Sequence, residues 1–230
     1  MAIAIADIHG CLEPLQALIE QIPPDEELVF LGDYVDRGPD SAGVVRFLVD
    51  LAKTRRCVFL MGNHEAMLAD AMARDDALPQ WLFNGGEATL ISYGIDADDW
   101  CARPAAQRNL PGFADFLARL RLYHEDADAI YVHAGIDVDV PAMEDQKRAV
   151  LLWVRERFTK AAGRWGGKPV VFGHTSTESL GAARGAVYLR PPLIGIDTGC
   201  VYGGNLTAFD TRTQRVWQVP GHTPAQRATA

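Results

Sequence analysis

Several apolar stretches of this chain run directly into glycine-containing turns that carry acids, amides or imidazoles. The clearest is residues 28–31, which reads as a buried strand and is followed by Gly32, Asp33, Asp36 and Arg37. Ending a strand with two carboxylates and a guanidinium is costly unless a ligand or counter-charge offsets their desolvation and repulsion. This feature constrains the fold and the function of the chain more than any other.

Four further strand-like stretches end in the same way. The polar residues at these tips are Asp7, His9, Asn63, His64, His133 and His174. In α/β sheets, ligands bind at the carboxyl ends of the parallel strands, so we expect the tips to converge. A cluster of this kind needs divalent cations, and its mixed donors suit Mn²⁺, Fe or Zn²⁺. The two remaining histidines, His124 and His222, are expected at the surface.

Strand and helix patterns alternate along the first part of the chain, which predicts an α/β fold with crossover connections. Helical spacing of apolar residues indicates helices over residues 12–21, 41–52 and 65–74. Strands are expected over residues 2–6, 28–31, 58–61, 130–132, 170–172, 186–189, 193–196, 206–209 and 216–219. From residue 183 onward strands and turns dominate, so we expect a β-rich second half.

The chain of 230 residues is expected to form a single domain over residues 1–220. Residues 78–125 show short helical patterns and are interpreted as a helical insertion, or lid, over the active site. Core packing is the stronger interpretation for Trp81 and Leu90, although Trp81, Phe83 and Tyr93 could instead offer an aromatic platform. Residues 221–230 are expected to form a flexible tail.

Composition limits the classes of partner. The net charge is −8, which argues against general nucleic-acid binding, since that function needs a basic surface. No apolar run is long enough for a membrane span, and the early first strand leaves no room for a signal peptide. The four cysteines form no CxxC pair, so reduced thiols and a cytoplasmic location are expected. The chain is also expected to be a monomer.

The motifs DIHG, GDYVDRGPDS, GNHE, HAG and GHT, in this order, resemble the phosphoprotein phosphatase branch of the calcineurin-like metallophosphoesterases. The small bacterial and phage serine/threonine phosphatases look most similar. The resemblance spans nearly the whole chain and departs from the family pattern at Ala6, where glycine is usual. It implies central mixed β-sheets packed as a β-sandwich and flanked by helices.

The resemblance also implies a site for two divalent ions, with Mn²⁺ favoured over Fe or Zn²⁺. Asp7 and His9 would hold the first ion, Asp33 would bridge the two, and a bridging hydroxide would attack phosphorus directly. The implied ligands of the second ion are Asn63, His133 and His174.

The remaining catalytic roles are implied in the same way. His64 would be the general acid, Asp36 would pair with it and keep it protonated, and Arg37 would grip the phosphate. The second phosphate clamp is Arg155 or Arg157. Helical geometry does not choose between these two arginines, and the resemblance of LLWVR to the family favours Arg155. Tyr202 would reach the pocket rim or simply lie in a hairpin turn.

Three functions follow. The leading hypothesis is a metal-dependent phosphatase acting on phosphoserine or phosphothreonine of proteins, with phosphotyrosine and small aryl phosphates as further substrates. The alternative is hydrolysis of a phosphoanhydride, such as a dinucleoside tetraphosphate or another nucleotide, on the same metal core. The third is a catalytically silent regulatory module, which the complete set of motif residues disfavours.

Overall fold

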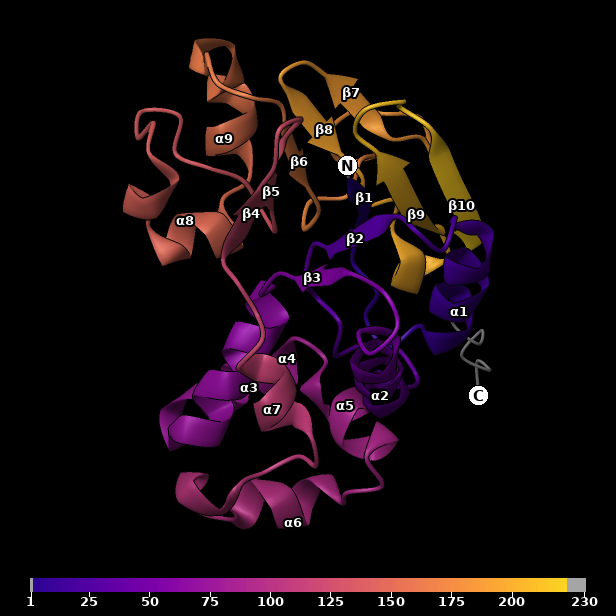
Figure 1. Ribbon diagram of the computed structural model, residues 1–230. Coiled ribbons are helices and arrows are strands. Elements are labelled where there is room, and N and C mark those ends of the chain that lie inside the picture. The colour runs from indigo at the N-terminus through magenta and orange to yellow at the C-terminus, as the bar shows by residue number, and fades with distance from the viewer. Residues whose placement is uncertain (1, 223–230) are drawn as a thin grey trace, which may run out of the picture.

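Two five-stranded mixed β-sheets pack face to face in the computed structural model, which describes residues 2–222 (Figure 1). The first sheet has the order β10-β9-β1-β2-β3, with β1, β2 and β3 parallel. Its strands are β1 (Ala2–Ile5), β2 (Glu27–Phe30), β3 (Cys57–Phe59), β9 (Asn205–Asp210) and β10 (Val216–Pro220). Antiparallel β9 and β10 extend the sheet on the β1 side.

The second sheet has the order β4-β5-β6-β8-β7, with β5, β6 and β8 parallel and an antiparallel strand at each edge. Its strands are β4 (Tyr123–Glu125), β5 (Ile130–Val132), β6 (Val170–Phe172), β7 (Tyr188–Arg190) and β8 (Leu193–Gly195). The predicted fold class, mixed sheets forming a β-sandwich flanked by helices, is therefore confirmed.

The helices lie on the outer faces of the two sheets. They are α1 (Leu12–Gln21), α2 (Ser41–Leu51), α3 (Asn63–Ala73), α4 (Leu78–Phe83), α5 (Gly86–Ser92), α6 (Ala97–Ala102), α7 (Phe113–Leu117), α8 (Arg148–Trp153) and α9 (Glu156–Ala161). The side chain of Asp40 caps α2 by accepting a 2.7 Å hydrogen bond from the Gly43 backbone N–H.

The alternation of side chains along β1 explains this layering. Ala2 and Ala4 face the second sheet, whereas Ile3 and Ile5 face the core shared with the helices. Small residues on the inner face of β1 allow the two sheets to approach closely. On the far side of the second sheet, Ile130 packs in a third core with residues of α8 and α9.

The helical region that was expected from residue 78 is present and packs below the first sheet in Figure 1. It ends earlier than predicted, because Tyr123–Glu125 forms β4 at the edge of the second sheet. His124 therefore lies half-buried in β4 with its ring stacked on Tyr131, and the expectation of a surface position was wrong. A three-residue edge strand with polar residues has no apolar periodicity by which to recognise it.

Trp81 and Leu90 are fully buried in the core, as the stronger interpretation held. Burial removes Trp81 from any aromatic platform, while Phe83 is 91% exposed. Whether the helical region acts as a lid stays a prediction. The expected flexible tail lies, beyond His222, outside the described residues, within which no helix is long and apolar enough to cross a membrane.

Candidate metal centre

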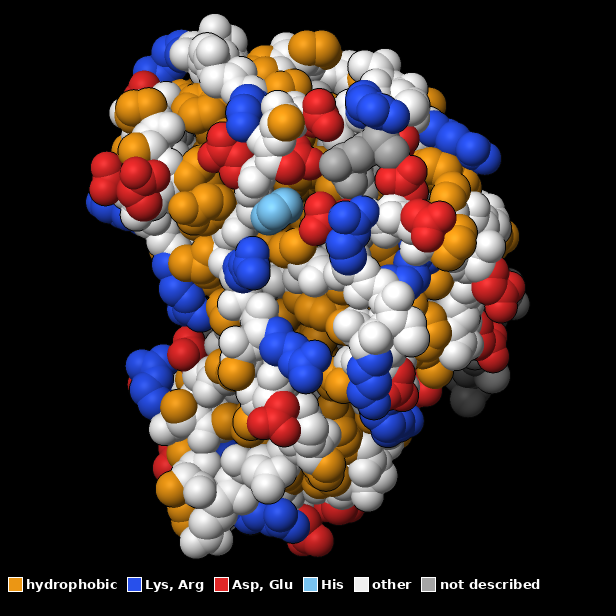
Figure 2. All heavy atoms as spheres, in the orientation of Figure 1, with side chains coloured by type: hydrophobic (Ala, Val, Ile, Leu, Met, Phe, Trp, Pro, Cys, Tyr) orange, Lys and Arg blue, Asp and Glu red, His pale blue; other side chains and the backbone are white. Residues whose placement is uncertain are grey.

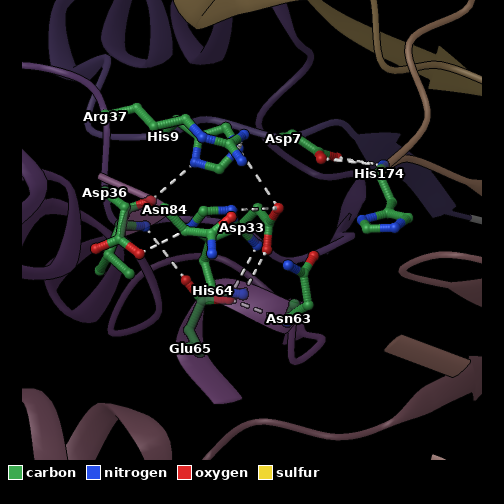
Figure 3. A network of polar contacts seen from close by, with 12 residues as sticks. Asp7, His9, Asp33, Asp36, Arg37, Asn63, His64, Glu65, Asn84 and His174 are labelled. Carbon is green, nitrogen blue, oxygen red and sulfur yellow. Dashed lines mark hydrogen bonds and ion pairs between the residues drawn. The ribbon is translucent and has the colours of Figure 1, made fainter. Parts of the chain in front are cut away.

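All ten predicted site residues converge on the carboxyl ends of the parallel strands. His9 follows β1, Asp33 follows β2, and His133 and His174 follow β5 and β6 in the second sheet. Asn63 and His64 form the first turn of α3, just after β3. Figure 3 shows Asp7, His9, Asp33, Asn63, His64 and His174 directed toward a common volume. The centre therefore lies where the tips of both sheets meet, as the α/β pattern predicted.

The backbone is strained at several residues of the candidate metal centre. Six described residues other than glycine have positive φ, and all but Gln214 are predicted site residues: His9, Asp33, Asp36, Arg37 and His174. This conformation costs free energy for residues with a Cβ, so the surrounding contacts must hold it. The chain is not extended at His9, whose φ is 46°.

Asp33 lies at the middle of the cluster. Its carboxylate oxygens lie 3.4 Å from His9 Nε2, 3.5 Å from His133 Nε2 and 4.0 Å from His64 Nε2. Two groups of buried side chains have ligand atoms within 4.8 Å of one another, and Asp33 belongs to both: His9, Asp33 and His64, and Asp33, His133 and His174. This arrangement matches a carboxylate shared by two ions.

Hydrogen bonds to the backbone fix the tautomers of two histidines. The Nδ1–H of His9 donates to the carbonyl oxygen of Val35 at 2.8 Å, and that of His133 donates to Leu31 at 3.0 Å. Each Nε2 is thereby left with a lone pair that points into the cluster. Burial lowers the pKa of His133 to about 3, so its imidazole is neutral.

Asp7 is held by the second sheet rather than by its neighbours in sequence. Both of its carboxylate oxygens accept hydrogen bonds from the backbone N–H of His174, at 3.1 and 3.0 Å. A Cβ at Gly173 would collide with the same carboxylate, which explains glycine at that position. Burial and the neighbouring Asp197 raise the pKa of Asp7 well above its ordinary value.

His64 pairs with Asp36, as the resemblance implied, at 2.7 Å between Nδ1 and Oδ2. Asp36 also accepts hydrogen bonds from Trp81 Nε1 and Thr89 Oγ1, at 3.0 and 2.7 Å from Oδ1. Both of these donors come from the helical region, which thus orients the His64–Asp36 pair. Burial lowers the pKa of His64 to about 2 and raises that of Asp36 to about 7. The pair alone therefore does not keep His64 cationic, and the negative charge of a bound phosphate would have to do so.

The two candidate phosphate clamps differ in position. Arg155 lines the central cavity and donates to the carbonyl oxygen of His174 at 3.0 Å, whereas Arg157 is exposed and pairs with Asp137 at 2.8 Å. The structure thus brings Arg155 to the site and leaves Arg157 outside it. The helix expected to carry both is interrupted, because α8 ends at Trp153 and α9 begins only at Glu156.

Arg37 also lines the cavity. Its Nη1 donates to His9 Nε2 at 2.8 Å, and its guanidinium lies 5.6 Å above the ring of Tyr202. The His9 lone pair is thus occupied by Arg37, which would have to move for His9 to bind a cation. Tyr202 lines the cavity and is 65% exposed, which resolves the choice between a rim position and a plain hairpin turn.

Glu65 is a functional residue to which the sequence assigned no role. Its Oε1 accepts from the backbone N–H groups of Tyr34 and Val35, and its Oε2 from those of Asp33 and Gly62, at 2.8–3.2 Å. One buried carboxylate therefore fixes the turn that carries Asp33. Its place in GNHE was the signal available, but three of the four partners, Asp33, Tyr34 and Val35, are about thirty residues away and invisible to local patterns.

Asp197 was also missed. It lines the cavity beside Asp7, and burial raises its pKa. It lies in IDTG after β8, a strand tip of the same kind as the five that were recognised.

The donor set fits bound divalent cations. The Nε2 atoms of His64 and His174 are buried and have no hydrogen-bond partner within the described residues. With its proton on Nδ1, His133 Nε2 is an acceptor that lies 2.9 Å from Asn63 Oδ1, a second acceptor, and a shared cation relieves such a contact. A cation also offsets the burial and the neighbouring negative charges that raise the pKa of Asp33 and Asp7.

Comparison with known families is consistent with this geometry. The model of the calcineurin-like phosphoesterases matches residues 2–226. The chain belongs to that family. This calcineurin-like phosphoesterase is therefore a metal-dependent phosphoester hydrolase in its general class.

Two curated relatives carry different names. The phosphoesterase is 32% identical to "Serine/threonine-protein phosphatase 1" of Salmonella typhimurium, covering 88% of each chain. It is 30% identical to "Bis(5'-nucleosyl)-tetraphosphatase, symmetrical" of Ralstonia nicotianae, covering 89% of this chain and 87% of the relative. A crystal structure described as that of a "putative diadenosine tetraphosphatase" superposes with a TM-score of 0.69 at 26% identity, covering 97% of this chain and 94% of the other.

Proposed function

We propose that this calcineurin-like phosphoesterase hydrolyses phosphomonoesters, with phosphoserine and phosphothreonine of proteins as the first candidate substrates. One observation carries the proposal. A cavity of about 180 Å³ is lined by the imidazoles of His9 and His174 and the carboxylates of Asp7 and Asp197. Arg37 and Arg155 line it too, and neither has a carboxylate partner within residues 2–222. Such a cavity suits an anion with several oxygens, and a tetrahedral phosphate is one.

The residues that would hold the ions are those expected from the sequence. Asp7 and His9 are assigned to the first ion, Asp33 to both, and Asn63 and His133 to the second together with His174. When bound, two divalent cations would neutralise the carboxylates, polarise the phosphate and provide a hydroxide nucleophile at neutral pH. Mn²⁺ is the first choice, because oxygen and imidazole donors dominate the set.

The chain itself binds and orients the substrate. Arg37 contacts His9 of the first sheet and Arg155 contacts His174 of the second, so their guanidinium groups would grip different phosphate oxygens. His64 faces Asp33 through an Nε2 that has no other partner within the described chain, and from there it would donate a proton to the leaving oxygen. Asp36 would hold the imidazole in that orientation.

Phosphoanhydrides are a second candidate substrate class. Two observations favour them: relatives are named as tetraphosphatases, and a second cavity shares Tyr202 with the first. The chemistry would be the same, with a phosphate rather than an alkoxide as the leaving group.

The test is hydrolysis of 4-nitrophenyl phosphate by protein purified without chelator, with Mn²⁺ added and then with excess EDTA. We expect turnover that EDTA abolishes and Mn²⁺ restores. Rates on a phosphoserine peptide and on a dinucleoside tetraphosphate then separate the two substrate classes. Absence of metal-dependent turnover on all three substrates would refute the proposal and favour a silent regulatory module.

A further inference from the structure

A hollow of about 220 Å³ lies between helix α8 on one side and helices α3 and α4 on the other. Figure 1 shows a gap between α8 and α3 at the left of the molecule, and in Figure 2 the surface is indented there, with Lys and Arg side chains above and below the indentation. The residues that line the hollow have no role in the hydrolysis described above.

The side chain of Trp153 connects the hollow with the metal centre. Trp153 lines the hollow, and its ring meets the imidazole of His174 edge-on, at 6.2 Å between ring centroids. His174 in turn lines the central cavity. The opposite wall of the hollow begins two residues after His64, with Ala66 and Met67 of α3. A chain whose phosphate occupies the central cavity can therefore continue past Trp153 into the hollow.

The size and lining of the hollow favour a side chain of a polymer over a whole small molecule. Sites that enclose small molecules typically measure about 300–1,000 Å³, and the hollow is smaller. Its floor is apolar, because Ala66, Met67 and Ala77 are at most 8% exposed, whereas its arginines are exposed. An apolar centre with a charged rim is typical of protein–protein contacts.

Exposed aromatic side chains near the metal centre also fit a polypeptide partner. Phe83, Trp153 and Tyr202 are all exposed. Tyr202 lines the central cavity, and Phe83 ends α4 two residues before Gly85, whose carbonyl oxygen accepts a 3.1 Å hydrogen bond from the Arg37 backbone N–H. Aromatic residues are enriched where proteins bind proteins. The surroundings of the site therefore suit a substrate that is itself a polypeptide.

Arg148 brings uncompensated positive charge to the rim of the hollow. Its Nη2 lies 3.2 Å from the sulfur of Met61, a weak and neutral acceptor, and the side chain forms no ion pair within residues 2–222. Arg74 also lines the hollow, but the carboxylates of Asp70 and Asp76 lie 4.0 and 3.8 Å from it. Helix stability does not explain Arg148, since the first turn of a helix favours acids over cations.

We propose that the hollow between α3, α4 and α8 binds the polypeptide beside the phosphorylated residue of the substrate, and that Arg148 selects an acidic side chain there. After its contact with Met61, the guanidinium keeps N–H donors that a carboxylate can accept. Trp153 packs against the peptide on its way to Arg148. This inference rests on the proposed function, because the phosphate of the peptide must occupy the central cavity.

Helix geometry gives the position of the acidic residue. Arg148 and Trp153 are the first and last residues of α8, which places them about 7.5 Å apart along the helix axis at about 1.5 Å per residue. An extended peptide covers that distance with about two residues, at about 3.3–3.6 Å each. We therefore expect the acid two or three positions from the phosphorylated residue, and on one side of it only, because the hollow extends in one direction.

The test uses phosphoserine peptides of equal length that carry glutamate, alanine or lysine at the second and third positions, on the amino or the carboxyl side of phosphoserine. On one side, the wild type should prefer glutamate over alanine by about two- to tenfold in kcat/KM, mainly through KM. The preference should weaken in about 0.5 M NaCl, because salt screens exposed charges. Arg148→Ala should remove it, and Arg148→Glu should shift it toward lysine.

Lys147→Ala is the matched control. Lys147 is exposed and adjoins Arg148 in the sequence, but it does not line the hollow. Its loss removes the same charge from the same end of α8 and should leave the preference for glutamate within about twofold of the wild-type value. Thermal unfolding of each variant excludes misfolding as the cause of any change.

The outcomes separate this inference from the proposed function. A wild type that hydrolyses neither the peptides nor 4-nitrophenyl phosphate refutes the proposed function. A wild type that hydrolyses the aryl phosphate but no peptide, or all peptides equally, leaves the hydrolase intact and overturns the role of the hollow. A preference that survives in Arg148→Ala, or that Lys147→Ala reduces as strongly, also overturns it. So does an equal loss on all substrates in Arg148→Ala, which would indicate an effect through Met61 on the metal centre.

Discussion

The Glu65 carboxylate should be one of the strongest single determinants of stability in this protein. Its two oxygens each accept two backbone hydrogen bonds, Oε1 from Tyr34 and Val35 and Oε2 from Asp33 and Gly62. Replacing Glu65 with Gln turns one oxygen into an NH₂ group. That group would face two N–H donors, so two of the four bonds are lost and two buried donors are left unpaired.

The cost can be estimated from these contacts. Two hydrogen bonds to a charged acceptor contribute roughly 3–6 kcal/mol. Burial raises the pKa of Glu65 from its ordinary 4.5 to about 7, so removing the buried charge offsets part of the loss. We expect a net decrease of roughly 2–4 kcal/mol in the free energy of unfolding, or a Tm lower by roughly 5–15 °C for a chain of this size.

The assay is thermal unfolding at pH 8 by circular dichroism. Because the folded protein holds the Glu65 proton more tightly than the unfolded chain does, ionisation costs stability between about pH 4.5 and pH 7, and the cost is constant above pH 7. Glu20→Gln is the control, since Glu20 is exposed on α1 and should change Tm by less than about 2 °C. If Glu65→Gln melts within 2 °C of the wild type, the four backbone contacts do not stabilise the Asp33 turn as argued.

Three further predictions follow from the same cluster. His64→Asn should lower kcat on an alkyl phosphate by roughly 10²–10⁴ and leave the metal content unchanged, as measured by single-turnover kinetics and elemental analysis; full activity would exclude His64 as the acid. Gly62→Ala should reduce metal content and Tm together, because its Cβ would collide with Asp33, and normal metal binding would contradict this. Trp81→Phe removes the Nε1 hydrogen bond to Asp36 and should cost roughly 1 kcal/mol of stability in urea unfolding, and an unchanged unfolding midpoint would contradict this.

Local patterns determined most of the fold and nearly all the predicted site residues. Apolar runs that end at Asp7, Asp33 or His174 are short-range signals, since a buried strand needs continuous apolar residues and a strained turn favours glycine. The order of these tips along the chain also fixed the family, because each motif combines a strand end with the residue types that suit a metal.

Only the tertiary structure decided which distant groups meet. Glu65 reaches the Asp33 turn, Trp81 reaches Asp36, and Arg155 rather than Arg157 faces the cavity, in each case across many residues of chain. The tertiary structure alone also showed the short strand β4, the break between α8 and α9, and the position of Tyr202 in the lining of the central cavity. The physical reason is that buried hydrogen-bond donors and acceptors are satisfied by whichever groups the packing of the two sheets brings near, and that packing has no local periodicity in the sequence.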